Sequence, residues 1–268
     1  MGEWSYLEEH YNKFCEDKRL TRRHGQVEYI TTMKYISKYL EELRASKNAN
    51  NIKILDIGAG TGAYSIPLAN EGYDVTAIEL VKYNVGVLKS KGSTVKARQG
   101  NALRLKNEPD NEYDVVLVLG PMYHLFKEED KVKVLQEARR VVKLEGVIFV
   151  AYLMNEYSII RHGFMENNIC ECIEAGQVDD DFHVKNSEKD LYDYVRIDDI
   201  DRLNGEVGLE RIQIIASTGV ANYIRSSLNV MDEATFDKFI QFHLLTCERG
   251  DLIGASSHVV DILRKVPN

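Results

Sequence analysis

The sequence predicts an α/β protein with a doubly wound, mostly parallel sheet, preceded by a helical segment and carrying an insertion after the fifth strand. Two observations predict this fold. Short apolar stretches alternate with helical patterns between residues 52 and 153, and such alternation favours parallel strands joined by right-handed crossovers. A glycine-rich turn, within "ILDIGAGTGAYSIPLA" at 54–69, follows the first apolar stretch. Ligands of such folds bind beyond the carboxyl ends of the strands.

The individual strands and helices follow from the residue patterns in chain order. The stretch "YDVVLVLG" at 113–120 is nearly all apolar and is expected to be buried on both faces. The helix at 128–143 has acidic residues first and basic residues last, as the helix dipole favours. The predicted strands are 52–57, 74–80, 94–100, 113–120, 146–153, 209–217 and 256–265, and the predicted helices are 63–72, 81–92, 128–143, 195–208 and 232–248. The last strand is expected beside the strand at 209–217.

Two segments lie outside this series and set the predicted domain boundaries. Residues 1–49 show apolar side chains at helical spacing, and the polar run "SKNANN" at 46–51 ends the segment. Between about 155 and 197 no strand pattern recurs, so this stretch is interpreted as an insertion over the sheet. The prediction is a helical N-terminal segment at 1–49 and a domain at 50–268 that contains the insertion.

Composition bounds the function. The chain has 268 residues, of which 44% are apolar and 28% charged, as in soluble globular proteins. Its net charge is 34 − 42 = −8, which counts against a nucleic-acid partner because phosphates are neutralised by clustered Lys and Arg. The basic stretch at 13–24 is interpreted as a solvated helix face. No long apolar run predicts a membrane span, and no apolar signal region follows the first residue, so a cytoplasmic location is expected.

Metal binding is not predicted. The four cysteines are Cys15, Cys170, Cys172 and Cys247, and their spacing is not that of a zinc ribbon or a thioredoxin-like site. We interpret them as buried or incidental thiols, with a soft-metal or arsenical site as the alternative.

The glycine-rich turn is compatible with more than one ligand. A phosphate-binding P-loop needs Lys and then Ser or Thr after its last glycine, whereas Ala63 and Tyr64 follow Gly62. A dinucleotide fingerprint formally fits Gly58, Gly60 and Ala63. A third interpretation combines these glycines with the carboxylate that precedes them.

Asp56 distinguishes the last two interpretations. A carboxylate two residues before the first glycine would repel a pyrophosphate and attract the ammonium of a methionine group. The difference in sign is worth on the order of a few kcal/mol at short range. Asp56 is also expected to accept hydrogen bonds from backbone N–H groups of the turn. The turn therefore favours a methionine-containing cofactor over NAD.

The stretch "ILDIGAGTGAYSIPLA" resembles the first motif of the class I S-adenosylmethionine-dependent methyltransferases, and the resemblance extends over about residues 52–153. The segments "LGPMYHLF", "HGQVEYITTMKYI" and "LIGASSHVVDILRK" also resemble a bacterial, small-molecule-type subgroup that is known more by sequence than by substrate. The resemblance implies a Rossmann-like methyltransferase fold, S-adenosylmethionine as cofactor and S-adenosylhomocysteine as product. It leaves the methyl acceptor open.

The same resemblance implies the residues of the cofactor site. Glu79 is expected to accept both ribose hydroxyls, since a carboxylate is a bidentate acceptor. Asn101 stands where the family often has Asp and is expected to accept from the adenine amino group, with a simple turn residue as the alternative. The implied cofactor-binding residues of the domain are Asp56, Gly58, Ala59, Gly60, Gly62, Glu79, Leu80, Asn101, Ala102 and Leu119.

The resemblance further implies that residues 1–49 fold over the cofactor as a lid. Tyr11 lies on this segment and is a candidate cofactor contact. Arg23 is a candidate partner of the cofactor carboxylate, for which a guanidinium gives a fork-shaped match. The alternative for Arg23 is ordinary surface charge.

Methyl transfer from a sulfonium is an in-line displacement that requires positioning and exclusion of water more than a catalytic triad. A base is needed only where the acceptor loses a proton. Tyr123 and His124 follow the fourth strand, where the methyl group is expected. His124 is hypothesised to be a general base or a group that orients the acceptor. The alternative is that His124 only packs against the cofactor or the core.

Four functions are thus compatible with the sequence. The first is methyl transfer to a small-molecule acceptor enclosed by the lid and the insertion. The second is methylation of RNA or protein, against which the acidic balance counts. The third is an NAD-linked oxidoreductase, which Asp56 opposes. The fourth is a relative that binds the cofactor without turnover. The oligomeric state is not predicted.

Overall fold

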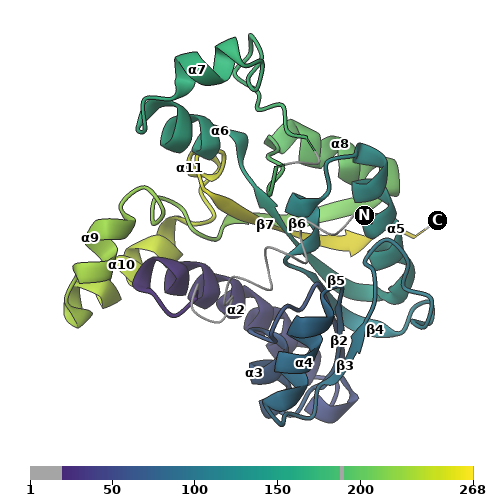
Figure 1. Ribbon diagram of the computed structural model, residues 1–268. Helices are drawn as coiled ribbons and strands as arrows, with labels where there is room; N and C mark the ends of the chain where they lie inside the picture. The colour runs from purple at the N-terminus through teal and green to yellow at the C-terminus, as the bar shows by residue number, and fades with distance from the viewer. Residues whose placement is uncertain (1–19, 188–189, 268) are drawn as a thin grey trace.

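The computed structural model describes residues 20–187 and 190–267, and a seven-stranded sheet forms its centre (Figure 1). The strand order is β3-β2-β1-β4-β5-β7-β6, and β7 runs antiparallel to both of its neighbours. The strands are β1 (Lys53–Ile57), β2 (Asp74–Glu79), β3 (Lys96–Gln99), β4 (Tyr113–Val118), β5 (Val142–Leu153), β6 (Leu209–Ala216) and β7 (His258–Lys265). The predicted mostly parallel sheet is confirmed, as is the pairing of the last strand with the strand before it.

Helices cover both faces of the sheet, as a doubly wound fold requires. Figure 1 shows α2, α3 and α4 on one side and α5 and α8 on the other. The helical segments are α2 (Arg23–Arg44), η2 (Ala49–Asn51), α3 (Ser65–Asn70), α4 (Lys82–Ser90), η3 (Pro121–His124), α5 (Glu128–Val141), α6 (Asn155–Ser158), the π-helix η4 (Ile159–Phe164), α7 (Ile169–Glu174), α8 (Ile197–Val207), α9 (Arg225–Val230), α10 (Glu233–Thr246) and α11 (Gly250–Ile253). The sequence patterns did not predict α9, α11 or η3.

The core forms two apolar layers because successive side chains of a strand point to opposite faces. Val115 and Leu117 of β4 pack in the layer beneath α2 and α3. Val116 and Val118 pack in the layer beneath α5 and α8. All four side chains are buried, so the expectation of a strand buried on both faces is confirmed.

One predicted boundary is wrong. The helix predicted at 128–143 ends at Val141, and β5 begins at Val142 rather than at residue 146. Val142 is buried and pairs with Tyr113 of β4. A β-branched residue suits a buried strand, and here pairing with β4 outweighs continuation of the helix.

The N-terminal helix and the insertion lie at the same edge of the sheet as the glycine turn. Val27 of α2 packs with Ala221, Leu228 and Phe236, which belong to the segment that carries α9 and α10. The insertion returns to the sheet at Val195, whose N–H donates to the carbonyl of Leu153 at 2.9 Å. Both segments therefore contact the part of the fold where a parallel sheet binds ligands.

The turn after β1 occupies the topological switch point of the sheet, because β1 lies between β2 and β4. Gly58 has a φ of +74°, and a Cβ atom there would lie 2.7 Å from Cδ of Pro121. Gly62 has a φ of +91°, and its Cβ would lie 3.0 Å from side-chain atoms of Ile66 and Leu88. The turn thus needs glycine both for its backbone and for the close approach of η3 and α4.

We predict that Gly58→Ala destabilises the fold, whereas Gly86→Ala does not. A left-handed backbone costs a residue with a Cβ about 1–2 kcal/mol, and the contact with Pro121 adds to this cost. Gly86 lies inside α4 with nothing within 4 Å of an added Cβ, so alanine should stabilise the protein by roughly 0.5–1 kcal/mol. Urea unfolding of both variants checks this; a loss of stability in Gly86→Ala, or none in Gly58→Ala, would contradict it.

Candidate functional site

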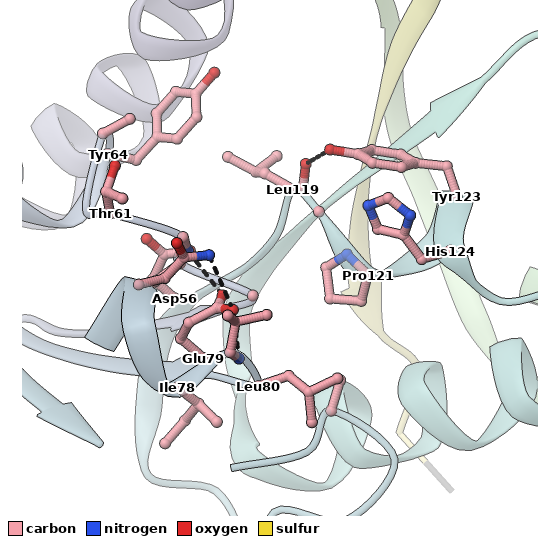
Figure 2. A pocket seen from close by; sticks show the side chains of 18 of the residues that line it. Asp56, Thr61, Tyr64, Ile78, Glu79, Leu80, Leu119, Pro121, Tyr123 and His124 are labelled. Atoms are coloured by element: carbon pink, nitrogen blue, oxygen red, sulfur yellow. Dashed lines mark hydrogen bonds between the residues drawn. The ribbon is translucent and has the colours of Figure 1, made fainter. Parts of the chain in front are cut away.

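A cavity of about 350 Å³ lies beyond the carboxyl ends of β1, β2 and β4. Figure 2 shows that the turn after β1 and the end of β2 form one side, while Leu119, Pro121, Tyr123 and His124 form the other. The lining residues are Leu20, Thr21, Tyr29, Asp56, Gly58, Ala59, Gly60, Thr61, Ala63, Tyr64, Ile78, Glu79, Leu80, Val81, Asn84, Gly100, Asn101, Ala102, Leu103, Leu119, Gly120, Pro121, Tyr123, His124 and Leu125. Its size is in the usual range of small-ligand sites.

Asp56 is a buried carboxylate at the end of β1, with 2% of its surface exposed. It accepts a hydrogen bond from Oγ of Ser65 in α3. Burial raises the pKa of Asp56 to about 7, the bond from Ser65 opposes this shift, and the nearby Glu79 carboxylate adds to it. An ionised Asp56 therefore has much to gain from a cation in the cavity.

The expectation that Asp56 accepts hydrogen bonds from the glycine turn is wrong. The N–H groups of Gly58 and Ala59 donate to the carbonyl of Ile78 at 2.7 and 3.2 Å. The N–H of Gly60 donates to Glu79 instead. The turn folds back on β2, so its donors point away from the carboxylate of β1.

Glu79 ends β2 and is also buried, with 7% of its surface exposed. Its Oε2 accepts the N–H of Gly60 at 2.9 Å, and its Oε1 accepts the N–H of Val81 at 2.8 Å. The amide nitrogen of Asn84 lies 3.5 Å from the same Oε1. These bonds fix the side chain at the cavity, and a carboxylate oxygen is the type of acceptor that suits the hydroxyls of a diol.

The floor near β3 contains three of the predicted cofactor residues, Leu80, Asn101 and Ala102. Oδ1 of Asn101 accepts the N–H of Leu103 at 2.9 Å. This is the turn that the sequence left open as an alternative. The amide oxygen retains a second lone pair, so a turn role does not prevent it from accepting from a ligand.

Tyr123 and His124 lie on η3 after β4, and both line the cavity. The hydroxyl of Tyr123 donates to the carbonyl of Leu119 at 3.1 Å. The His124 ring is 8% exposed, and its Nδ1 lies 2.9 Å from the carbonyl oxygen of Leu191 in the insertion. The ring centres of Tyr123 and His124 lie 4.8 Å apart, in an edge-on arrangement. The structure therefore brings both candidate catalytic residues to the cavity.

Two predicted cofactor residues do not line the cavity, and a third lies outside the described residues. Gly62 does not line the cavity and instead allows α4 to approach the turn. Arg23 begins α2, and its guanidinium lies 5.2 Å above the ring centre of Phe236 in α10, away from the lining residues. The predicted pairing of Arg23 with a cofactor carboxylate gains no support from this position. Tyr11 lies outside the described residues.

An aromatic wall of the cavity was not predicted from the sequence. Tyr29 of α2 and Tyr64 of the glycine turn both line it, with ring centres 5.5 Å apart. Asn84, at the start of α4, also faces Glu79. Tyr64 immediately follows the turn in sequence and could have been found by that position. Tyr29 carries no such signal because its place depends on how α2 packs.

Metal-binding groups and membrane-spanning helices are both absent from the described residues, 20–187 and 190–267. Among them no group of three or more His, Cys, Asp or Glu side chains could hold a metal ion. In the same part of the chain, no helix combines the length and apolar character needed to cross a membrane. Cys170 is exposed, and Cys172 and Cys247 are buried free thiols.

Comparison with known proteins places these features in a family. Residues 55–150 match the family model described as "Methyltransferase domain". The chain is 28% identical over 131 residues to a glycine/sarcosine N-methyltransferase of Parasynechococcus marenigrum, covering 45% of this chain and 46% of that protein. It is 32% identical over 107 residues to a ubiquinone biosynthesis O-methyltransferase of Rickettsia prowazekii, covering 38% of each. The matches thus span less than half the length of these curated relatives.

Solved structures share the fold across the whole chain. The crystal structure of magnesium protoporphyrin IX methyltransferase from Synechocystis with bound S-adenosylmethionine has a TM-score of 0.56 and 11% sequence identity, and covers 99% of this chain and 98% of that one. At this identity the likeness concerns the fold. Together, the family match over the glycine turn and the ends of β2 and β4 and the shared fold identify residues 55–150 as a methyltransferase domain.

Proposed function

We propose that this protein transfers a methyl group from S-adenosylmethionine to a small-molecule acceptor. The observation that carries the proposal is the pair of buried carboxylates, Asp56 and Glu79, that line one cavity beside a glycine turn. The cavity's lining residues in the described part of the chain include no Lys or Arg. Two lining acids, with neither Lys nor Arg among the described lining residues, suit a cationic, diol-bearing ligand and oppose a pyrophosphate.

The lining residues fit this cofactor group by group. Asp56 supplies charge for the methionine ammonium, and because burial raises its pKa to about 7, a nearby cation would stabilise its ionised form. Glu79 supplies a carboxylate, the type of acceptor suited to the ribose hydroxyls. Ile78, Leu80 and Leu103 give the apolar surface that an adenine needs. Tyr29 and Tyr64 extend the binding wall beyond the residues that the sequence predicted.

The bound cofactor would supply a methyl group on an already activated sulfonium. The protein's part is then to hold the acceptor in line and to exclude water. Where the acceptor's nucleophilic atom carries a proton, His124 is the titratable group on η3 that could take it. Tyr123 would shape the space beside His124, since its hydroxyl is bonded to the carbonyl of Leu119.

The class of acceptor is part of the proposal. The relatives named above are N- and O-methyltransferases of small molecules by their names. The acidic balance of the chain favours a small molecule over RNA as the acceptor. A cytoplasmic location, as predicted from the sequence, belongs to the same proposal.

Calorimetric titration with S-adenosylmethionine, S-adenosylhomocysteine and NAD side by side tests the proposed cofactor. A ligand at about 100 times its Kd should raise the free energy of unfolding by roughly 2.7 kcal/mol. Binding and stabilisation by NAD alone would overturn the proposal.

We predict that Glu79→Ala weakens S-adenosylmethionine binding by on the order of 2–3 kcal/mol, because hydrogen bonds to a charged acceptor are lost. The change also releases the N–H of Gly60, so unfolding curves must accompany the affinity measurement. Glu210→Ala is the matched control, since Glu210 is an exposed carboxylate on the far edge strand β6. A change in Kd of less than about threefold for Glu79→Ala would count against the ribose role.

A second prediction concerns Asp56→Asn, which removes a charge and keeps the shape and a partner for Ser65. Above pH 7, where Asp56 is ionised, the variant should bind S-adenosylmethionine about tenfold more weakly, near 1.4 kcal/mol. NAD binding should hardly change. A dinucleotide site would give the opposite result, with tighter NAD binding and no loss of S-adenosylmethionine affinity.

The affinity for S-adenosylmethionine should depend on pH through the protonation of Asp56. The free protein holds a proton on Asp56 below about pH 7, and a bound ammonium favours the ionised form, so protonation competes with binding. In the wild type, affinity for S-adenosylmethionine should fall as the pH falls below about 7. In Asp56→Asn this fall should disappear. If Kd depends on pH in the same way in both proteins, a group other than Asp56 is responsible, which would contradict the prediction.

His124→Gln tests the base hypothesis once an acceptor is in hand. Glutamine keeps a polar side chain but cannot take the proton, and general-base contributions are typically about 10²–10⁴-fold in rate. We expect kcat to fall within that range with little change in cofactor affinity. Near-normal turnover with an unchanged pH profile would assign His124 a packing role.

A further inference from the structure

The segment 190–195, here called the strap, runs from the insertion back to the sheet and crosses η3 on the way. The strap carbonyl of Leu191 lies 2.9 Å from Nδ1 of His124. The N–H of Asp193 donates to the carbonyl of Tyr123 at 2.8 Å. Val195 ends the strap on β5, where its N–H donates to Leu153. Two successive contacts thus fix the strap against the two candidate catalytic residues.

The contact with Leu191 determines which nitrogen of His124 carries the proton. A backbone carbonyl can only accept a hydrogen bond, so Nδ1 must be the donor. In the neutral ring the proton is then on Nδ1, and the basic lone pair is on Nε2. Tyr192 packs on the same ring, with centres 5.5 Å apart and planes inclined by 33°, so the strap also fixes the plane of the imidazole.

The strap is anchored by an ion pair that contributes nothing to the cavity lining. Nζ of Lys131 in α5 contacts Oδ2 of Asp193, and the two side chains are 9% and 14% exposed. The other carboxylate oxygen, Oδ1, accepts from the amide of Asn186 at 3.2 Å. Loss of either partner of a buried Lys–Asp pair strongly destabilises the fold, because the remaining charge is then buried without compensation. This pair therefore holds the strap in one place.

We propose that Asp193, with Lys131, is a positioning residue that fixes His124 as the Nδ1–H tautomer, so that Nε2 serves as the proton acceptor. The inference rests on the proposed function and narrows its substrate class. The acceptor is one whose nucleophilic oxygen or nitrogen bears both a lone pair and a proton, such as a hydroxyl or a neutral amine. As the bond to the methyl group forms, that atom's proton moves to Nε2 of His124. The cofactor's sulfur keeps the electron pair of the broken bond.

The tautomer of His124 can be determined by NMR spectroscopy without a methyl acceptor. Long-range ¹H–¹⁵N correlation spectra of the neutral imidazoles distinguish Nδ1–H from Nε2–H, and His124→Gln identifies the His124 signal. We expect the Nδ1–H form in the wild type. In Asp193→Asn the strap loses its charged anchor, and a mixture of both tautomers should appear. Glu210→Gln, which breaks an exposed ion pair on β6, is the matched control and should give the wild-type spectrum.

Asp193→Asn leaves the charge of Lys131 without its partner, so this variant is accompanied by Lys131→Met, which keeps the length and removes the charge. Either folded variant carries the test, with folding checked by its thermal transition. A wild-type ring in the Nε2–H form would overturn the proposal. So would a wild-type tautomer ratio in both variants, because the anchor would then have a structural role only.

A kinetic measurement separates this proposal from the proposed function. With a methyl acceptor, Asp193→Asn should lower kcat and shift the pH profile, while KM for S-adenosylmethionine stays unchanged. A loss confined to stability, with the wild-type pH profile, would contradict positioning. Failure of the wild type to bind S-adenosylmethionine would overturn the proposed function instead, whatever tautomer His124 adopts.

Discussion

The hydrogen bond from the N–H of Gly60 to Glu79 joins the two halves of the candidate cofactor site. Glu79 ends β2, and Gly60 lies in the turn after β1. The turn is drawn onto β2 by this bond and by the two N–H groups that donate to Ile78. Gly58 is then held so close to Pro121 that a side chain would not fit. One carboxylate thus sets the spacing between the turn and η3, and so the width of the cavity.

The same arrangement explains why the site needs a cation. Burial raises the pKa of Asp56, and the nearby Glu79 carboxylate, which is also buried, adds to this rise. Glu79 is satisfied by backbone donors, whereas Asp56 has the hydroxyl of Ser65. A hydroxyl stabilises a carboxylate less than a positive charge does. In the proposed function, the ammonium of the cofactor supplies a positive charge beside Asp56. An anionic ligand would instead add a negative charge next to two buried carboxylates, so the site selects against it.

Sequence patterns were enough to predict the sheet and the side of the cavity formed by β1 and β2. Asp56 and Glu79 come at the ends of strands, so their position follows once the strands are known. Arg23, Tyr29 and the strap were beyond such reasoning, because their positions depend on how separate segments pack. Arg23 lies against Phe236, more than two hundred residues away in sequence. Asn101 is the opposite case, because its contact is local. Its Oδ1 accepts the N–H of Leu103, and such a turn role could be predicted from the residue type.

The two sides of the cavity differ in how they are held. Bonds within the chain segment 56–81 build the cofactor side, so it can be kept as a unit. The η3 side is held by Leu191, Asp193 and Lys131, two of them in the insertion. An insertion can change in length and sequence without disturbing β1 or β2, because its contacts are with η3, α5 and the end of β5. A change in the insertion would therefore act on the η3 side of the cavity through these contacts, and not directly on β1 or β2.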